Sequence, residues 1–195
     1  MSVRLALVLS ALLLSHVAPA QAARALPRRV PAHQWSHALL RNQATAVLAA
    51  PLDSVWALVG DPARLPEYSG VVKVEVDRSR VTGPGDAGCR RRCTFPGGET
   101  FDEVVFWADP PYAFVSGAPA GPSREAGDVS VVTLEPLGER HTLFTWRQYY
   151  DFADLAPVVA EYERGINDIA DRLVKRFGGY VVAPSAMRAE AAPAR

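Results

Sequence analysis

The sequence has few cysteines and no surplus of charge of either sign. Only two cysteines occur among its 195 residues, which excludes a framework of several disulfide bonds. The 21 lysines and arginines balance the 21 aspartates and glutamates, so the formal net charge is zero. Because a nucleic-acid-binding protein carries a basic excess on one face, we expect no nucleic-acid partner.

Long hydrophobic runs are also scarce. The main one, residues 5–14, follows Arg4 and is too short to anchor a chain in a bilayer. Small residues alternate at Ala18, Ala20 and Ala22, as at a cleavage site. We therefore predict a secretory signal peptide over residues 1–22, the alternative being an uncleaved or buried N-terminal helix. The mature protein is expected to be secreted or periplasmic, without stable membrane insertion after cleavage.

The rest of the chain has the composition of one folded domain. Hydrophobic residues make up 49% and charged residues 22%, close to the average for globular proteins. Residues 23–40 form an N-terminal leader without sustained periodicity. We place the folded domain at residues 41–180 and a disordered, Ala- and Pro-rich tail at residues 181–195.

Periodicity predicts mainly strands in the first part of the domain. A strand over 41–50 ends at Pro51, and two short helices follow over 52–59 and 61–66, the first capped by Asp53 or Ser54. Short alternating segments then predict an antiparallel sheet. These strands are expected at 71–76, 88–95, 99–107, 112–116, 128–135 and 142–152, with a flexible loop at 117–127.

An amphipathic helix closes the domain. Its apolar stripe has spacings of three and four and consists of Val158, Tyr162, Ile166, Ile169, Leu173 and Phe177. Gly178 and Gly179 predict its end.

This order of elements resembles the START-like superfamily, specifically its bacterial polyketide cyclase/dehydrase-type proteins. The matching residues are Ala50-Pro51, 55–61 (VWALVGD), 88–92 (GCRRR), Glu103-Val104, 109–111 (DPP) and Thr145-Trp146, within 42–178. The resemblance implies an α+β helix-grip fold. In it, a curved antiparallel sheet of six to seven strands wraps around a long C-terminal α-helix, with two short helices after the first strand. It also implies an internal cavity that holds a hydrophobic small molecule or lipid; a minority of the family are enzymes.

Strand parity predicts which side chains face such a cavity. The inner faces of two neighbouring strands would be Cys89, Arg91, Cys93 and Phe95, and Phe101, Glu103, Val105 and Trp107. A loop of odd length at 96–98 puts both sets on one side. Arg91 then lies opposite Glu103, which predicts a cross-strand ion pair facing the cavity and anchoring a ligand's polar group. The alternatives are a purely structural pair, or a slipped register that turns both outward.

The other candidate ligand-binding residues are aromatic or branched. They are Tyr68, Val105, Trp107, Phe144, Trp146, Tyr150, Tyr162, Ile166 and Ile169. Together they would form an aromatic-rich wall, and the alternative is an ordinary solid core.

The cysteines and histidines point to no cofactor or metal site. Four residues of straight strand span about 13 Å, whereas a disulfide bond needs Cα atoms about 4.4–6.8 Å apart. Cys89 and Cys93 are therefore either two buried free thiols or a disulfide across a bulge or turn. His33 and His37 share a spacing of four, but no third ligand is evident.

No catalytic motif is present, so we assign no catalytic residue and weigh three functions. A carrier of a hydrophobic small molecule or lipid predicts a large apolar cavity with few titratable groups. A polyketide cyclase-like enzyme, using Glu103 with Arg91 or a pocket tyrosine, predicts convergent polar groups with shifted pKa values. A protein-interaction module predicts a filled core and an exposed apolar patch.

Overall fold

The computed structural model describes residue 30 and residues 32–182. The predicted signal peptide, the leader up to residue 29 and the tail from residue 183 lie outside the described residues. Among the helices within this part of the chain, none combines the length and the apolar character needed to cross a membrane.

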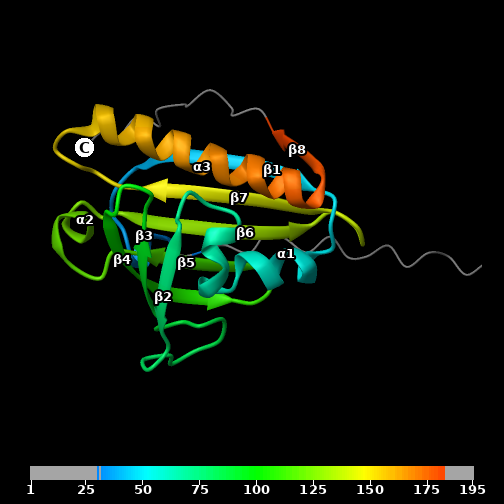
Figure 1. Cartoon of the computed structure of the whole chain (residues 1–195), viewed down its shortest axis with the longest axis horizontal. Coiled ribbons are helices and arrows are strands. Elements are labelled where there is room, and N and C mark those ends of the chain that lie inside the picture. Colours follow the sequence, from blue (N-terminus) through cyan, green and yellow to red (C-terminus); the bar gives the residue numbers. More distant parts are fainter. Residues whose placement is uncertain (1–29, 31, 183–195) are drawn as a thin grey trace, which may run out of the picture.

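The centre of the fold is an antiparallel sheet of eight strands in the order β2-β3-β4-β5-β6-β7-β1-β8 (Figure 1). The strands are β1 (Leu40–Leu48), β2 (Lys73–Asp77), β3 (Arg90–Thr94), β4 (Thr100–Asp109), β5 (Ala113–Gly117), β6 (Val129–Pro136), β7 (Thr142–Tyr149) and β8 (Gly179–Val182). Sequence periodicity predicted seven of these and missed β8, which is too short to show alternation. Because Val181 and Val182 pair with β1, the tail predicted from residue 181 begins too early.

The described residues also form three α-helices and two short 3₁₀-helices. These elements are η1 (Ala32–Gln34), α1 (Leu52–Val59), η2 (Pro62–Glu67), α2 (Gly121–Glu125) and α3 (Leu155–Phe177). Pro51 is the N-cap of α1 and provides no side-chain cap, so the expected cap by Asp53 or Ser54 is wrong. The segment predicted as a flexible loop contains α2, a single helical turn that periodicity cannot reveal.

The long helix α3 lies along β7 and β1 and covers the inner face of the sheet (Figure 1). This arrangement confirms the predicted helix-grip fold. The buried residues of α3, namely Ile166, Ile169, Ala170 and Leu173, all belong to its C-terminal half. Residues 155–165 include none that is buried, although Val158 and Tyr162 belong to the apolar stripe. The N-terminal half of α3 therefore packs loosely over the inner face.

The described part of the leader covers the outer face of the sheet. Val30, Ala32 and Trp35 pack against a small cluster that includes Val115 and Val131. The ring centroids of Trp35 and Trp107 lie 6.1 Å apart. The contact of Trp35 with this face shows that the described part of the leader packs against the sheet.

A β-bulge in β4 changes the parity on which the prediction for Trp107 depended. Val105 pairs with Ser116, but Trp107 pairs with Val115, so Phe106 is the extra residue. After the bulge, Ala108 faces inward and belongs to the main core cluster. Trp107 faces outward and packs against the cluster on the outer face. The prediction that Trp107 shares the inner face with Val105 is wrong, because alternation was assumed to continue unbroken.

Candidate functional site

The predicted ion pair between Arg91 and Glu103 is confirmed. The two residues are direct partners in the β3–β4 register, and Arg91 Nε and Nη2 each lie 2.7 Å from Glu103 Oε2. Their side chains are only 3% and 12% exposed, and Ser116 Oγ donates a hydrogen bond to Glu103 Oε1 at 3.3 Å. Burial, the largest single influence, lowers the pKa of Arg91, but the charge and hydrogen bond of Glu103 together with the nearby Tyr68 and Cys93 raise that pKa overall. Arg91 is therefore charged at neutral pH and is paired directly with Glu103.

Both cysteines are free and buried, as one of the two alternatives predicted. Cys93 Sγ lies 3.8 Å from Glu103 Oε2, and burial together with that charge raises the pKa of Cys93 to about 12. Burial also raises the pKa of Cys89. Since the thiolate is the nucleophilic form, neither cysteine is suited to covalent catalysis.

The ion pair is one end of a row of polar side chains that crosses the inner face on neighbouring strands. Register places Ser116 opposite Ser130, Ser130 opposite Gln148, and Gln148 opposite Asn42. We call Arg91, Glu103, Ser116, Ser130, Gln148 and Asn42 the polar row. Sequence analysis missed Ser116, Ser130 and Asn42 as site residues. The alternation of side chains along each strand was the available signal. Only the pairing register between the strands shows that these residues form one row.

The next inward-facing pairs along the same strands are apolar. Phe114 pairs with Val132, and Val132 pairs with Trp146. The rings of Phe114 and Trp146 meet edge to face with centroids 6.5 Å apart. These residues belong to the main core cluster, together with Ile166 and Ile169 of α3. The inner face therefore changes from apolar to polar within two residues along each strand.

Two polar atoms at this boundary have no hydrogen-bond partner among the described residues. They are Trp146 Nε1 and Gln148 Oε1, both fully shielded from solvent. A third such atom, Thr133 Oγ1, belongs to the opposite face, because Thr133 pairs with Thr145 while its neighbour Val132 faces inward. Leaving a buried polar atom unpaired costs about 1–3 kcal/mol. A bound polar group at the inner boundary would remove that cost.

A second cluster of titratable groups lies at the polar end of the inner face. Asp128 comes two residues before Ser130 and accepts a hydrogen bond from Tyr162 Oη of α3 at 2.7 Å. Tyr150 Oη donates to Asn42 Oδ1, and the rings of Tyr150 and Tyr162 lie 4.9 Å apart. Figure 1 shows that α3 begins on the side of the molecule where α2 lies. Asp128 follows α2 closely in the sequence.

These surroundings shift the pKa values of the cluster. Burial raises the pKa of Asp128 to about 6, against the opposing effect of the Tyr162 hydrogen bond. Burial likewise raises the pKa of Tyr150 to about 12, and it raises the pKa of Tyr162. Asp128 is thus the carboxyl group at this site whose charge changes near neutral pH.

The predicted site residues fall into three groups. Tyr68, Val105, Phe144, Trp146, Ile166 and Ile169 belong to the main core cluster. Arg91, Glu103, Tyr150 and Tyr162 lie at its polar end, and Trp107 lies on the outer face. The Tyr68 hydroxyl is buried and donates to the Val59 carbonyl at 3.2 Å. Direct ligand contacts for these residues remain predictions.

The protein also has two open, polar hollows on its surface. One, of about 310 Å³, is lined by Arg91 and Glu103 together with charged residues such as Glu75, Arg90 and Asp102. The other, of about 380 Å³, lies beside α1 and is lined by Trp56, Asp61, Arg78 and Asp86, among others. Neither of these two hollows is the enclosed apolar cavity that we expected.

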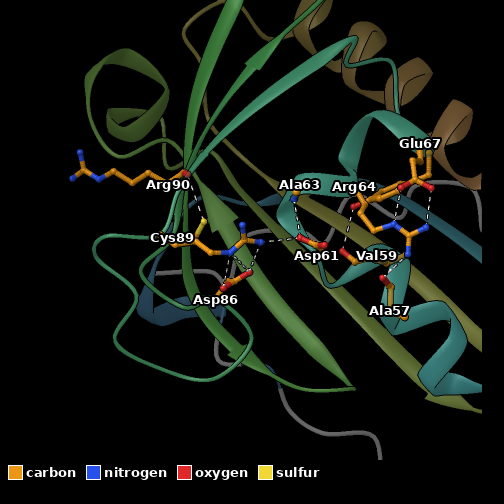
Figure 2. Close-up of polar contacts among 11 residues, drawn as sticks. Ala57, Val59, Asp61, Ala63, Arg64, Glu67, Asp86, Cys89 and Arg90 are labelled. Carbon is orange, nitrogen blue, oxygen red and sulfur yellow. Dashed lines mark hydrogen bonds and ion pairs between the residues drawn. The ribbon is translucent and has the colours of Figure 1, made fainter.

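Ion pairs among the residues that line the second hollow indicate a structural role for it. Arg78 Nη2 lies 2.9 Å from Asp61 Oδ1 and 3.0 Å from Asp86 Oδ2, so it links the β2–β3 connection to the start of η2. Figure 2 shows both carboxylates, with Asp61 also accepting from the Ala63 amide. The nearby Arg64 binds Glu67 and the Ala57 carbonyl. These partly exposed pairs satisfy one another and leave the inner face as the better candidate site.

The sequence matches one family model over residues 40–180, that of "Polyketide cyclase / dehydrase and lipid transport". The match covers β1 to β7 and α3, and it ends within β8. No curated protein matches the sequence significantly.

Several solved structures share this fold at low sequence identity. The protein XoxI from Bacillus cereus is 14% identical, with a TM-score of 0.56, over 70% of this chain and 94% of that chain. Protein NE0264 from Nitrosomonas europaea is 17% identical, with a TM-score of 0.53, over 70% and 95%. Norcoclaurine synthase from Thalictrum flavum, solved with dopamine and hydroxybenzaldehyde, is 17% identical, with a TM-score of 0.52, over 76% and 91%. At these identities the likeness shows the fold alone.

Proposed function

Because the chain belongs to the polyketide cyclase / dehydrase and lipid transport family, we propose that it binds an amphipathic small molecule or lipid between α3 and the inner face of the sheet. The observation that carries this proposal is the pair of buried, unpaired atoms Trp146 Nε1 and Gln148 Oε1. They lie where an apolar wall meets the polar row, so a ligand with one apolar and one polar end would satisfy both.

The apolar part of the ligand would lie against Phe114, Val132 and Trp146. Each Å² of apolar surface removed from water contributes about 25 cal/mol to binding. Its polar end would reach Gln148 and the polar row. The N-terminal half of α3, which includes no buried residue, is the segment that would move to admit it.

Secretion or export to the periplasm is part of the proposal and is supported by the sequence pattern of residues 1–22. The mass of the mature protein from its own host would test it, since cleavage after Ala20 or Ala22 removes a defined segment.

Replacing Gln148 by leucine is expected to separate ligand binding from stability. The change removes an unpaired buried oxygen, so the free energy of unfolding should rise by about 1 kcal/mol in urea denaturation. The affinity for 1-octanol, measured by isothermal titration calorimetry, should fall because the hydroxyl group loses its acceptor.

Thr133→Val is the matched control for this experiment. It also removes an unpaired buried oxygen, but on the outer face. It should stabilise the protein similarly and leave 1-octanol binding unchanged. If both variants lose affinity equally, the proposed site is wrong.

Catalysis is the second candidate, favoured by the convergence of titratable groups with shifted pKa values. Glu103 is held by Arg91 and Ser116, whereas the one hydrogen-bond partner of the Asp128 carboxylate among the described residues is Tyr162, and burial raises the pKa of Asp128 to about 6. Asp128 with Tyr162 is therefore a better acid–base pair than the predicted Glu103. Any turnover of an aromatic polyketide analogue should then show a pH limb near 6.

A further inference from the structure

Asp128 is a buried carboxyl group that has no cationic partner in the part of the chain that the structure describes. The residue is only 5% exposed, and its carboxylate accepts a hydrogen bond from the neutral hydroxyl of Tyr162. Within residues 30 and 32–182, no lysine or arginine forms an ion pair with it. The other acid of the inner face, Glu103, is neutralised by Arg91. A buried carboxylate is costly unless a positive charge or several donors accompany it.

The groups around Asp128 suit a cation. The aromatic rings of Tyr150, Phe152 and Tyr162 form a compact cluster, with centroid distances of 4.9 to 6.5 Å. The faces of aromatic rings attract cations. Gln148, two residues before Tyr150 and on the same face by strand parity, adds an unpaired acceptor in Oε1. Apart from the Trp146 Nε1 donor, the free hydrogen-bonding capacity here consists of acceptors, namely Gln148 Oε1 and the Asp128 carboxylate.

We propose that the polar end of the ligand is a protonated amine, held by the Asp128 carboxylate and the Gln148 Oε1 atom beside the rings of Tyr150 and Tyr162. This inference rests on the proposed function and specifies its ligand as an amphipathic amine. The amine's N–H groups donate to the unpaired Gln148 Oε1 atom and to the Asp128 carboxylate, which already accepts from Tyr162. The amine's charge supplies the counter-charge that Asp128 lacks among the described residues.

The inference excludes an anionic polar end at this position. A carboxylate or phosphate would lie beside Asp128. Among the described residues, the cations Arg91 and Arg41 already pair with Glu103 and Asp151, respectively. Like charges at short range in a poorly solvated site repel strongly. A fatty acid should therefore bind more weakly than an amine with the same chain.

Three probes with one apolar body and different polar ends test the inference. We would titrate the protein with octylammonium chloride, 1-octanol and sodium octanoate at pH 8, below their micelle concentrations, by isothermal titration calorimetry. At this pH Asp128 is ionised, since its pKa is about 6, and the amine is protonated. We expect octylammonium to bind at least about tenfold more tightly than 1-octanol, and octanoate more weakly than both.

Asp128→Asn should abolish the preference for octylammonium over 1-octanol. The control Asp102→Asn makes the same charge change at an exposed carboxylate on the outer side of β4, which pairs with Arg92, and should keep the preference. Equal affinities of the wild type for octylammonium and 1-octanol would overturn the inference while leaving the proposed function standing. Failure of all three probes to bind would overturn both, and the wild-type comparison decides the matter even if a variant misfolds.

Discussion

Replacing Asp128 by asparagine is expected to stabilise the protein by about 1–3 kcal/mol at pH 8. The folded state raises the pKa of this carboxyl group from 3.8 to about 6, mainly through burial. A rise of that size corresponds to about 3 kcal/mol between the two protonation states. Asparagine is uncharged, and its Oδ1 atom can still accept the hydrogen bond from Tyr162.

The stabilisation should depend on pH in a defined direction. Below about pH 4, Asp128 is protonated in both the folded and unfolded chains, so it does not change the balance between them. Between about pH 4 and pH 6 the unfolded chain releases the proton first, and wild-type stability falls as the pH rises. The asparagine variant should lack this contribution.

Urea denaturation of both proteins at pH 4, 5, 6 and 8 measures this difference. The gain should be near zero at pH 4 and complete above pH 7, and Asp102→Asn should show no such gain. An equal difference between wild type and Asp128→Asn at all four pH values would contradict the raised pKa. A stabilising substitution that weakens ligand binding would mark Asp128 as a residue kept for function.

Replacing Arg91 by methionine is expected to destabilise the protein by about 3–5 kcal/mol. The change leaves the Glu103 carboxylate buried without its cation, which is the costly half of a broken buried ion pair. The double variant Arg91→Met/Glu103→Leu should recover most of this loss, because two apolar side chains of similar size need no mutual charge compensation.

The neighbouring pair provides a matched control. Arg92 and Asp102 are partners on the same two strands but on the other face, 2.7 Å apart, with side chains 56% and 51% exposed. Arg92→Met should cost less than about 1 kcal/mol, as exposed ion pairs do. Urea denaturation of the four proteins gives the comparison. A similar cost for Arg91→Met and Arg92→Met would show that burial of the Arg91 pair has no energetic consequence.

Local patterns were sufficient for most of the fold. Alternation and Gly or Pro turns predicted seven of the eight strands, and the stripe from Val158 to Phe177 predicted α3. Errors occurred where an element was too short to show a period, as in α2 and β8. Another error occurred at the β4 bulge, which broke the alternation and placed Trp107 on the outer face of the sheet.

Some residues of the candidate site could likewise be predicted from local patterns, and others could not. Arg91 and Glu103 were predicted because one short hairpin connects their strands, and a turn of odd length determines which residues face each other. Asn42 and Gln148 are 106 positions apart, and Asp128 and Tyr162 lie on a strand end and a helix. No pattern along the chain aligns such pairs, and their registers follow from how whole strands and α3 pack.

The sequence by itself determined the type and order of the elements, the helix-grip family and one buried ion pair. These depend on contacts within a few residues or across one turn, which the periodicity of side chains specifies directly. Only the tertiary structure decided that the polar row is continuous. It also decided that, among the residues it describes, Trp146 and Gln148 keep unpaired atoms and Asp128 has no counter-charge. Burial and pairing are properties of all neighbours in space, and those neighbours come from segments far apart along the chain.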